Sequence, residues 1–140
     1  MKSIAQILTE SRTIAVVGLS NNPERASHEV AEYLQGHGYR VVPVNPVYAG
    51  QSILGEPCHA SLVEAAAALA PLQIDLVDCF RKADQIVPLA REAVQIRARC
   101  LWLQLDIVNE EAAELARAAG LDVVMDRCTK IEHAKLGLAR

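Results

Sequence analysis

The sequence predicts an α/β protein, folded as a Rossmann-like, doubly wound parallel sheet of five strands in three layers. Short apolar runs rich in valine, isoleucine and leucine alternate along the chain with stretches whose apolar residues recur at helical spacing. Runs of this kind are typical of parallel strands covered by helices on both faces. The 140 residues, 51% of them apolar, are enough for one domain with a substantial core.

Five apolar runs are predicted to form the strands. They are residues 13–18, 39–44, 74–80, 100–104 and 121–125. Each ends in a glycine or a polar residue, or is followed directly by one, where a turn can begin. Pro43 lacks a backbone N–H, so the second strand is expected to bulge or to lose pairing near its end.

Helices are predicted before, between and after these strands. Ser61 with Glu64 fits a capping box at the start of an alanine-rich helix. Asn109 is expected to cap a later helix, which stops at Gly120. The helical stretches are residues 1–11, 30–36, 61–68, 86–94, 109–120 and 130–140. Because crossovers between parallel strands are nearly always right-handed, this order of elements gives one doubly wound sheet.

Composition and charge exclude several classes of function. The net charge of −3 and the pI near 5.8 disfavour a nucleic-acid binder, which would need a basic surface. A small anionic ligand remains compatible with this charge, because it needs only a local positive site. Neither a signal peptide nor a membrane span is expected, since no long uninterrupted apolar run occurs. The four cysteines form no CxxC pair, so we expect no metal site, reduced thiols and a cytoplasmic protein.

In open parallel sheets, ligands bind beyond the carboxyl ends of the strands. The turn after the first strand comprises Gly18, Leu19, Ser20 and Asn21, with Arg25 close behind. The glycine permits close backbone approach, the polar side chains can donate hydrogen bonds, and the arginine can hold a phosphate through two bonds. This turn therefore predicts an anion site, although an ordinary strand-to-helix turn is the alternative.

The turn after the second strand differs from that of an NAD site. Such a site places Asp or Glu here to accept hydrogen bonds from a ribose, but the next acid in this chain is Glu56. Pro43 and Pro46 are expected to hold the backbone rigid and to leave the Asn45 amide facing a ligand. A rigid loop without a binding role is the alternative.

Two further strand ends carry candidate residues. Phe80 and Arg81 offer a flat ring and a cation, suited to an adenine and a phosphate. The alternative is a core phenylalanine beside helix-start charge. Gln104 ends the fourth apolar run and is expected near the point where the strand order switches.

A catalytic interpretation rests on Cys128. Its neighbours Arg127 and Lys130 could lower the pKa of its thiol, and His133 could act as its base. A buried, inert cysteine is the more common outcome.

Other titratable residues carry less information. Asp75 and Asp78 are three positions apart in a strand and so face opposite sides, which disfavours a catalytic carboxylate pair. His28, His37 and His59 show no metal-ligand spacing and are expected at the surface.

Several sequence blocks together resemble a known family. They are IAVVGLS at 14–20, GYRVVPVNP at 38–46, IDLVDCFR at 74–81, WLQL at 102–105 and MDRC at 125–128. This set resembles the bacterial CoA-binding-domain proteins, small relatives of the CoA-binding domain in the α subunit of succinyl-CoA ligase. The resemblance covers nearly the whole chain, and the Pro-Val-Asn-Pro block with the Phe-Arg pair makes it specific.

The resemblance implies one Rossmann-like domain, residues 1–140, that binds coenzyme A or an acyl-CoA. The implied contacts are Gly18, Leu19, Ser20, Asn21 and Arg25 at the phosphates, Val44, Asn45 and Pro46 at the adenosine end, Phe80 and Arg81 at the next wall, and Gln104 at the inner end. Asp106 stands where the family usually has glycine. Its side chain and charge are expected to narrow the pantetheine path or to weaken coenzyme A binding.

The resemblance favours binding over catalysis. The ligase relatives react through a phosphorylated histidine in a second domain, with a partner subunit, and no histidine here stands in a matching motif. We therefore expect a coenzyme A binding protein without its own catalysis, whose partner is a small nucleotide ligand. The alternatives are a CoA- or NAD(P)-dependent enzyme and a ligand-regulated subunit of a larger complex. No sequence feature points to a protein partner.

Overall fold

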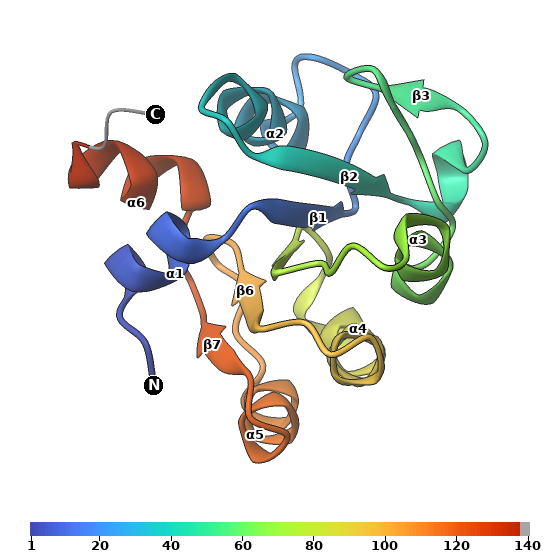
Figure 1. Ribbon diagram of the computed structural model, residues 1–140. Helices are drawn as coiled ribbons and strands as arrows, with labels where there is room; N and C mark the ends of the chain where they lie inside the picture. The colour runs from blue at the N-terminus through green and yellow to red at the C-terminus, as the bar shows by residue number, and fades with distance from the viewer. Residues whose placement is uncertain (138–140) are drawn as a thin grey trace.

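Five parallel strands form the central sheet of the computed structural model, which describes residues 1–137 (Figure 1). Their order across the sheet is β2-β1-β5-β6-β7. The strands are β1 (Thr13–Val17), β2 (Arg40–Val44), β5 (Leu76–Cys79), β6 (Cys100–Leu103) and β7 (Asp122–Val124). All four neighbouring pairs in this sheet are parallel, which confirms the predicted fold.

Helices cover both faces of the sheet, giving three layers (Figure 1). On one face lie α1 (Ile4–Glu10), α2 (Ala26–Gly36) and α6 (Thr129–Leu136). On the other lie α3 (Leu62–Leu69), α4 (Ile86–Gln95) and α5 (Glu110–Ala118). The helix predicted for residues 130–140 is described as far as residue 137, and its last three positions lie outside the described residues. No helix among residues 1–137 is long and apolar enough to cross a membrane.

The sequence did not indicate a small excursion between β2 and α3. It contains two short strands, β3 (Ser52–Ile53) and β4 (Glu56–Pro57), which pair antiparallel apart from the main sheet. A 3-10 turn, η1 (Pro46–Tyr48), precedes them, and a second, η2 (Ala83–Gln85), leads into α4. Strands this short lack a periodicity long enough to read.

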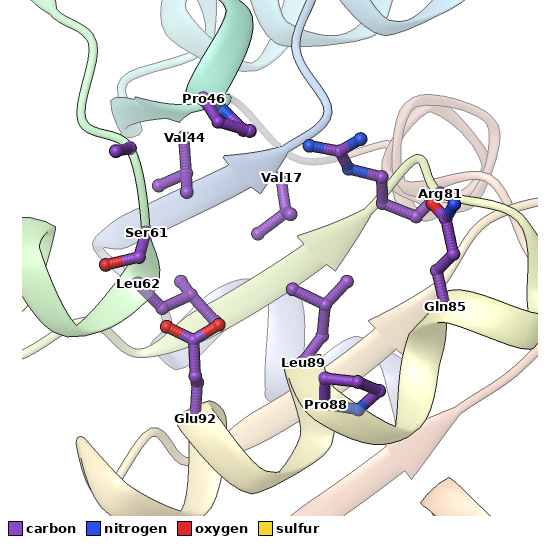
Figure 2. Close-up of a pocket in the computed structure, with 11 residues that line it drawn as sticks. Val17, Val44, Pro46, Ser61, Leu62, Arg81, Gln85, Pro88, Leu89 and Glu92 are labelled. Atoms are coloured by element: carbon purple, nitrogen blue, oxygen red, sulfur yellow. The ribbon is translucent and has the colours of Figure 1, made fainter. Parts of the chain in front are cut away.

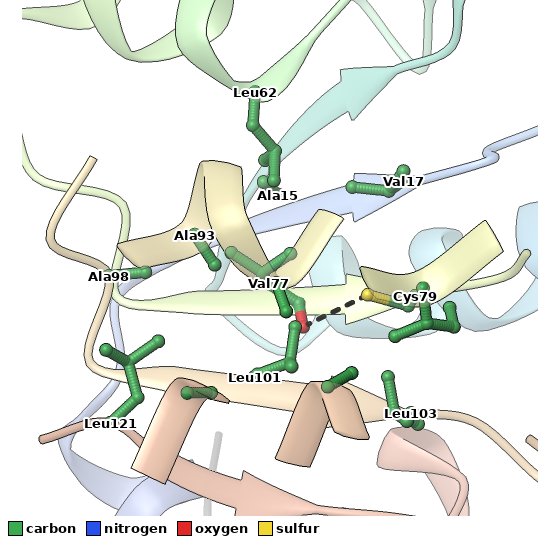
Figure 3. Close-up of a cluster of buried hydrophobic side chains, with 14 of the residues drawn as sticks. Ala15, Val17, Leu62, Val77, Cys79, Ala93, Ala98, Leu101, Leu103 and Leu121 are labelled. Atoms are coloured by element: carbon green, nitrogen blue, oxygen red, sulfur yellow. Dashed lines mark hydrogen bonds between the residues drawn. The ribbon is translucent and has the colours of Figure 1, made fainter. Parts of the chain in front are cut away.

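Alternate residues of each strand build two separate apolar cores. Ala15, Val17 and Val77 face α3, α4 and α5 in one core, which is shown in Figure 3. Small side chains from these helices, such as Ala93 and Ala112, fill that core and let the helices approach the sheet closely. The second core, on the α1, α2 and α6 face, holds these strand and helix residues: Ile14, Val16, Leu76, Trp102, Leu8 and Leu34.

Pro43 does not interrupt its strand, so the predicted bulge or loss of pairing is wrong. β2 pairs with β1 as far as Val17↔Val44, with Pro43 opposite Val16. The reason is that β2 lies at the edge of the sheet. The Pro43 carbonyl accepts the His59 N–H (3.1 Å) on the outer side, and the missing N–H also faces that edge.

One histidine is also misplaced by the sequence prediction. His28 was expected at the surface, but it is buried on the inner face of α2, one turn from Ala31. His37 and His59 are partly exposed. A single polar residue within an apolar helical face can thus be drawn inside by its neighbours.

Candidate functional site

The strand order reverses between β1 and β5, and the candidate site lies at their carboxyl ends. The chain leaves β1 for one edge of the sheet and later returns to β5 on the other side of β1. Gly18 follows β1 with φ +88°, and a Cβ there would lie 2.4 Å from the Phe80 carbonyl oxygen. Only glycine fits this contact, which brings the turns after β1 and β5 together.

The turn after β1 is held in one conformation by its own side chains. The Ser27 hydroxyl accepts the Ser20 N–H (3.0 Å), and the Ser20 hydroxyl accepts the Asn22 N–H (3.0 Å). Asn22 in turn accepts the Glu24 N–H through Oδ1 (3.0 Å). The turn is therefore preorganised before any ligand arrives.

Asn45 ties the turn after β2 to the turn after β1. Its Nδ2 donates to the Leu19 carbonyl (3.1 Å), and its Oδ1 accepts the Val47 N–H (3.0 Å). The amide is thus engaged within the protein, where the sequence suggested that it faces a ligand. The Leu19 side chain is also turned inward, fully buried in the core.

A polar pocket of about 600 Å³ opens over these two turns. We call it the polar pocket; its lining is Gly18, Ser20, Asn21, Asn22, Arg25, Ala26, Ser27, Asn45, Val47, Tyr48 and Phe80. No carboxylate belongs to this lining. Arg25 precedes the first turn of α2 and makes no ion pair within the described part of the chain, so its guanidinium is available.

An apolar pocket of about 360 Å³ adjoins the polar pocket. We call it the apolar pocket; its lining is Ala26, Val30, Phe80, Arg81, Gln104, Leu105, Ile107 and Cys128. Ala26 and Phe80 line both pockets, so the two form one groove along the carboxyl edge of the sheet. This lining also contains one arginine and no carboxylate.

A third, smaller pocket of about 230 Å³ lies on the opposite face of the sheet, between α3 and α4 (Figure 2). We call it the α3–α4 pocket. Val17, Val44 and Pro46 line it from the strand ends, and Arg81 reaches over it from the turn after β5. Because Arg81 also lines the apolar pocket, this side chain connects the two.

Residues 12–134 match the protein family described as the CoA binding domain. The chain belongs to this family. The uncharacterized protein YneT of Bacillus subtilis is 40% identical over 131 residues, which cover 94% of this chain and 92% of that protein. The resemblance seen in the sequence blocks is thereby confirmed.

Several solved structures share this fold. The structure of "cell-free ID.343" from Thermus thermophilus is 35% identical, with a TM-score of 0.84 over 95% of this chain and 96% of that one. A hypothetical protein from Pyrococcus horikoshii is 38% identical, with a TM-score of 0.86 over 95% and 89%. An acetyl-coenzyme A synthetase of Ca. Korarchaeum cryptofilum shares the fold at 20% identity and a TM-score of 0.68, with the match covering 88% of this chain and 27% of that one.

In this CoA binding domain, most of the residues singled out from the sequence meet at one edge of the sheet. Ten of them line the three pockets: Gly18, Ser20, Asn21, Arg25, Val44, Asn45, Pro46, Phe80, Arg81 and Gln104. Leu19 lines none of these pockets with its side chain and contributes its carbonyl to Asn45 instead.

Asp106 also lies outside the lining of the groove. Its neighbours Leu105 and Ile107 face the apolar pocket, whereas Asp106 is exposed. It has φ +67°, a left-handed conformation that favours glycine, and its N–H is accepted by Asp126 Oδ1 (2.7 Å). Its side chain therefore does not narrow the groove, and its charge alone remains close by.

Several lining residues had no readable signal in the sequence. Tyr48 reaches the polar pocket because η1 turns the chain after Asn45. Leu89 and Glu92 reach the α3–α4 pocket from α4, far along the chain. The helical pattern of α4 predicted which face is apolar, but only the packing of α3 against α4 places these residues in the same pocket as Pro46.

Cys128 lines the apolar pocket, but the structure assigns His133 to another contact. Cys128 is 7% exposed and immediately precedes α6. His133 is buried one turn further along, and its Nδ1 is hydrogen-bonded to the Tyr33 hydroxyl (2.8 Å), with Tyr39 packed edge-on against its ring. This histidine therefore joins α2 to α6. Among the described residues, no group of three or more His, Cys, Asp or Glu side chains could hold a metal ion.

Asp75 and Asp78 have separate structural environments. Asp75 Oδ2 accepts the N–H groups of Arg12 (2.8 Å) and Thr13 (3.0 Å), which anchors the start of β1. Asp78 is fully buried beside Thr129, and burial raises the pKa of its carboxyl to about 8.

Proposed function

We propose that this domain binds coenzyme A or an acyl-CoA along the carboxyl edge of its sheet, without catalysis of its own. The observation that carries the proposal is the continuous groove formed by the polar and apolar pockets. This groove contains two arginines and no carboxylate, and it lies at the switch in strand order. An anionic ligand with a long, partly apolar arm is complementary to it.

The polar pocket is the proposed phosphate site. Arg25 can reach a phosphate with paired N–H groups, and the Ser20 hydroxyl can still donate its hydrogen. The backbone N–H groups of Ala26 and Ser27, in the first turn of α2, donate no hydrogen bond within the described part of the chain. The positive end of the helix dipole adds to this attraction.

The α3–α4 pocket is the proposed adenosine end. Val44 and Pro46 supply a rigid apolar wall, and the Arg81 guanidinium can stack on a purine ring or reach a phosphate. Glu56, the first acid after β2, pairs with Arg40 (3.3 Å) and lines none of the three pockets. The lack of a ribose-binding acid at this position disfavours NAD.

The apolar pocket is the proposed path of the pantetheine arm. Its walls are mostly hydrocarbon, with Gln104 as the buried polar group at the inner end. An arm that is largely apolar, with a few carbonyl groups, suits such walls. Cys128 stands at the same end of the pocket.

We also propose that the chain is a single domain working in the cytoplasm. The main sheet, its two helical layers and the small β3–β4 pair take up the described residues, which supports a single folding unit. The four cysteines are free and buried, as suits a reducing compartment.

Isothermal titration with coenzyme A, acetyl-CoA, NAD and NADP tests the proposal. We expect binding of one or both CoA species and none of either dinucleotide. Arg25→Ala should weaken CoA binding by about 1–3 kcal/mol, because a charge-assisted contact is lost. Arg91→Ala, at an exposed arginine on α4 that lines none of the three pockets, is the matched control. Folded protein that gives no heat with either CoA species would refute the proposal.

A further inference from the structure

Three buried polar side chains form a hydrogen-bonded network that ends at the wall of the apolar pocket. Asp78 lies in β5, Gln104 directly after β6, and Thr129 at the start of α6. The Thr129 Oγ1 atom lies 2.9 Å from Asp78 Oδ2 and 3.2 Å from Gln104 Oε1. The Thr129 N–H also donates to Gln104 Oε1 (3.1 Å). All three side chains are at least 96% buried.

The positions of the hydrogens in this network follow from counting its donors and acceptors. The Thr129 hydroxyl has one hydrogen, and two acceptor oxygens lie within reach of it. If Asp78 is ionised, one of those oxygens loses that hydrogen. If Asp78 is protonated, its O–H donates to Thr129 Oγ1, and the Thr129 hydrogen is free for Gln104 Oε1. Only the protonated carboxyl gives every short contact a hydrogen.

The surroundings of Asp78 favour the same protonation state. Its Oδ1 is buried and has no hydrogen-bond partner within the described part of the chain. Val16 of β1 and Trp102 of β6 flank it across the sheet. The nearest titratable groups on the strands are the thiols of Cys79 and Cys100, whose pKa values burial raises. An ionised carboxylate would thus be desolvated with only the hydrogen bond from the Thr129 hydroxyl to compensate.

The titratable groups of α6 are engaged elsewhere. Lys130 pairs with Glu29 (2.8 Å) at the surface, and His133 is bonded to Tyr33. Asp78 forms no ion pair among the described residues. Cys128, which directly precedes Thr129, lines the apolar pocket.

The assignment of these hydrogens determines how the Gln104 amide is turned. With two donors on Oε1, the Nε2 group must point away from Thr129. Gln104 lines the apolar pocket, so this NH2 group is a donor available there, in addition to Arg81. We propose that Asp78 and Thr129 are positioning residues that orient the Gln104 NH2 toward a ligand carbonyl, and that deprotonation of Asp78 weakens this contact.

This arrangement of Asp78, Thr129 and Gln104 suits a ligand that places a hydrogen-bond-accepting carbonyl in the apolar pocket. An amide of the pantetheine arm and the thioester of an acyl-CoA both qualify, so the inference rests on the proposed function. When Asp78 ionises, its carboxylate accepts the hydrogen bond from the Thr129 hydroxyl. Gln104 Oε1 then keeps only the Thr129 N–H, and its orientation is held less firmly.

Titration of acetyl-CoA at pH 7 and pH 9 tests the device, since this ligand has no free thiol. Wild-type affinity should fall about threefold to tenfold between the two pH values, the effect of one hydrogen bond. Asp78→Asn should keep the affinity of pH 7 at both values, because its NH2 donates to Thr129 as the protonated carboxyl does. Cys128→Ser, run in parallel, should retain the wild-type dependence.

Thr129 variants separate positioning from a merely structural role. Thr129→Val should lose about threefold to tenfold in affinity at pH 7 and show no further loss at pH 9. Thr129→Ser should restore both the affinity and the pH dependence. An Asp78→Asn protein with the wild-type pH dependence, or a Thr129→Val protein that binds as wild type, would overturn the proposal.

A measurement without ligand keeps this test apart from the proposed function. The side-chain NH2 resonances of Gln104 should shift between pH 7 and pH 9 in the wild type and stay constant in Asp78→Asn. If acetyl-CoA does not bind, the proposed function fails while this result still reports on the device. Gln104 resonances that do not respond to pH in the wild type would overturn the device even if acetyl-CoA binds.

Discussion

Substitution of Gly18 by alanine tests the contact on which the whole site is built. An alanine Cβ would stand 2.4 Å from the Phe80 carbonyl oxygen and 3.1 Å from its carbonyl carbon. Phe80 cannot easily retreat, because its N–H donates to Val17 (2.8 Å), and the Gly18 N–H donates to Val44 (2.8 Å). One of the two turns must therefore move by about 1 Å to restore ordinary contact.

The expected loss of stability has two parts. A left-handed φ costs an alanine about 1 kcal/mol relative to glycine. Forcing the two anchored turns apart adds about 1–3 kcal/mol, as overpacking does elsewhere. The sum, about 2–4 kcal/mol, is a large share of the stability of a domain this size.

Gly50 provides a matched control for the first part. Its φ of +86° is nearly that of Gly18, but a Cβ there meets no atom within 4 Å. Gly50→Ala should therefore cost only about 1 kcal/mol. Both variants are compared with wild type by urea denaturation in the absence of ligand. Equal losses for the two variants would show that the Phe80 contact is not what requires glycine at position 18.

Three other predictions concern single side chains. Asn45→Ala should lower the free energy of unfolding by about 1–3 kcal/mol in urea denaturation, because the Leu19 carbonyl and the Val47 N–H lose their partner. Unchanged stability would show that these two hydrogen bonds do not stabilise the fold. Asp78 binds a proton in the folded state up to about pH 8 but ionises near its ordinary pKa of 3.8 when unfolded, so it should make stability fall as pH rises from 5 to 8. Denaturation at several pH values should show a shallower fall in Asp78→Asn, and an identical slope would contradict the raised pKa. Asp106→Gly should raise the free energy of unfolding by up to about 1 kcal/mol, because the left-handed strain is relieved. The melting temperature should rise slightly, and a lower one would contradict this.

The architecture was predictable because it depends on short-range patterns. The apolar runs at residues 13–18 and 100–104 contain strands β1 and β6. Ser61 and Asn109 cap their helices by accepting the N–H groups of Glu64 and Ala112. These signals lie within a few residues of one another, so they can be read along the chain. Pro43 shows the limit: its effect depends on whether β2 is an edge strand, and strand order is a tertiary property.

Part of the site was predictable for the same kind of reason. The ends of parallel strands meet at one edge of a sheet, so Gly18, Asn45, Phe80 and Gln104 could be placed together without coordinates. The hydrogen-bond partners of each side chain could not be predicted in this way. Asn45 lines the polar pocket, but the hydrogen bond from its amide to the Leu19 carbonyl had no signal in the sequence.

Fold class, strand ends and family membership therefore follow from the order of residues, since they depend on local periodicity and on blocks of adjacent letters. The division of the edge into three pockets depends on helix packing: α3 and α4 enclose one, while α2 and the turn before α6 enclose the others. The link from Asp78 through Thr129 to Gln104 also belongs to the tertiary structure. Its members lie 25 and 51 positions apart, and only the sheet and α6 bring them within hydrogen-bond distance, where burial changes their chemistry.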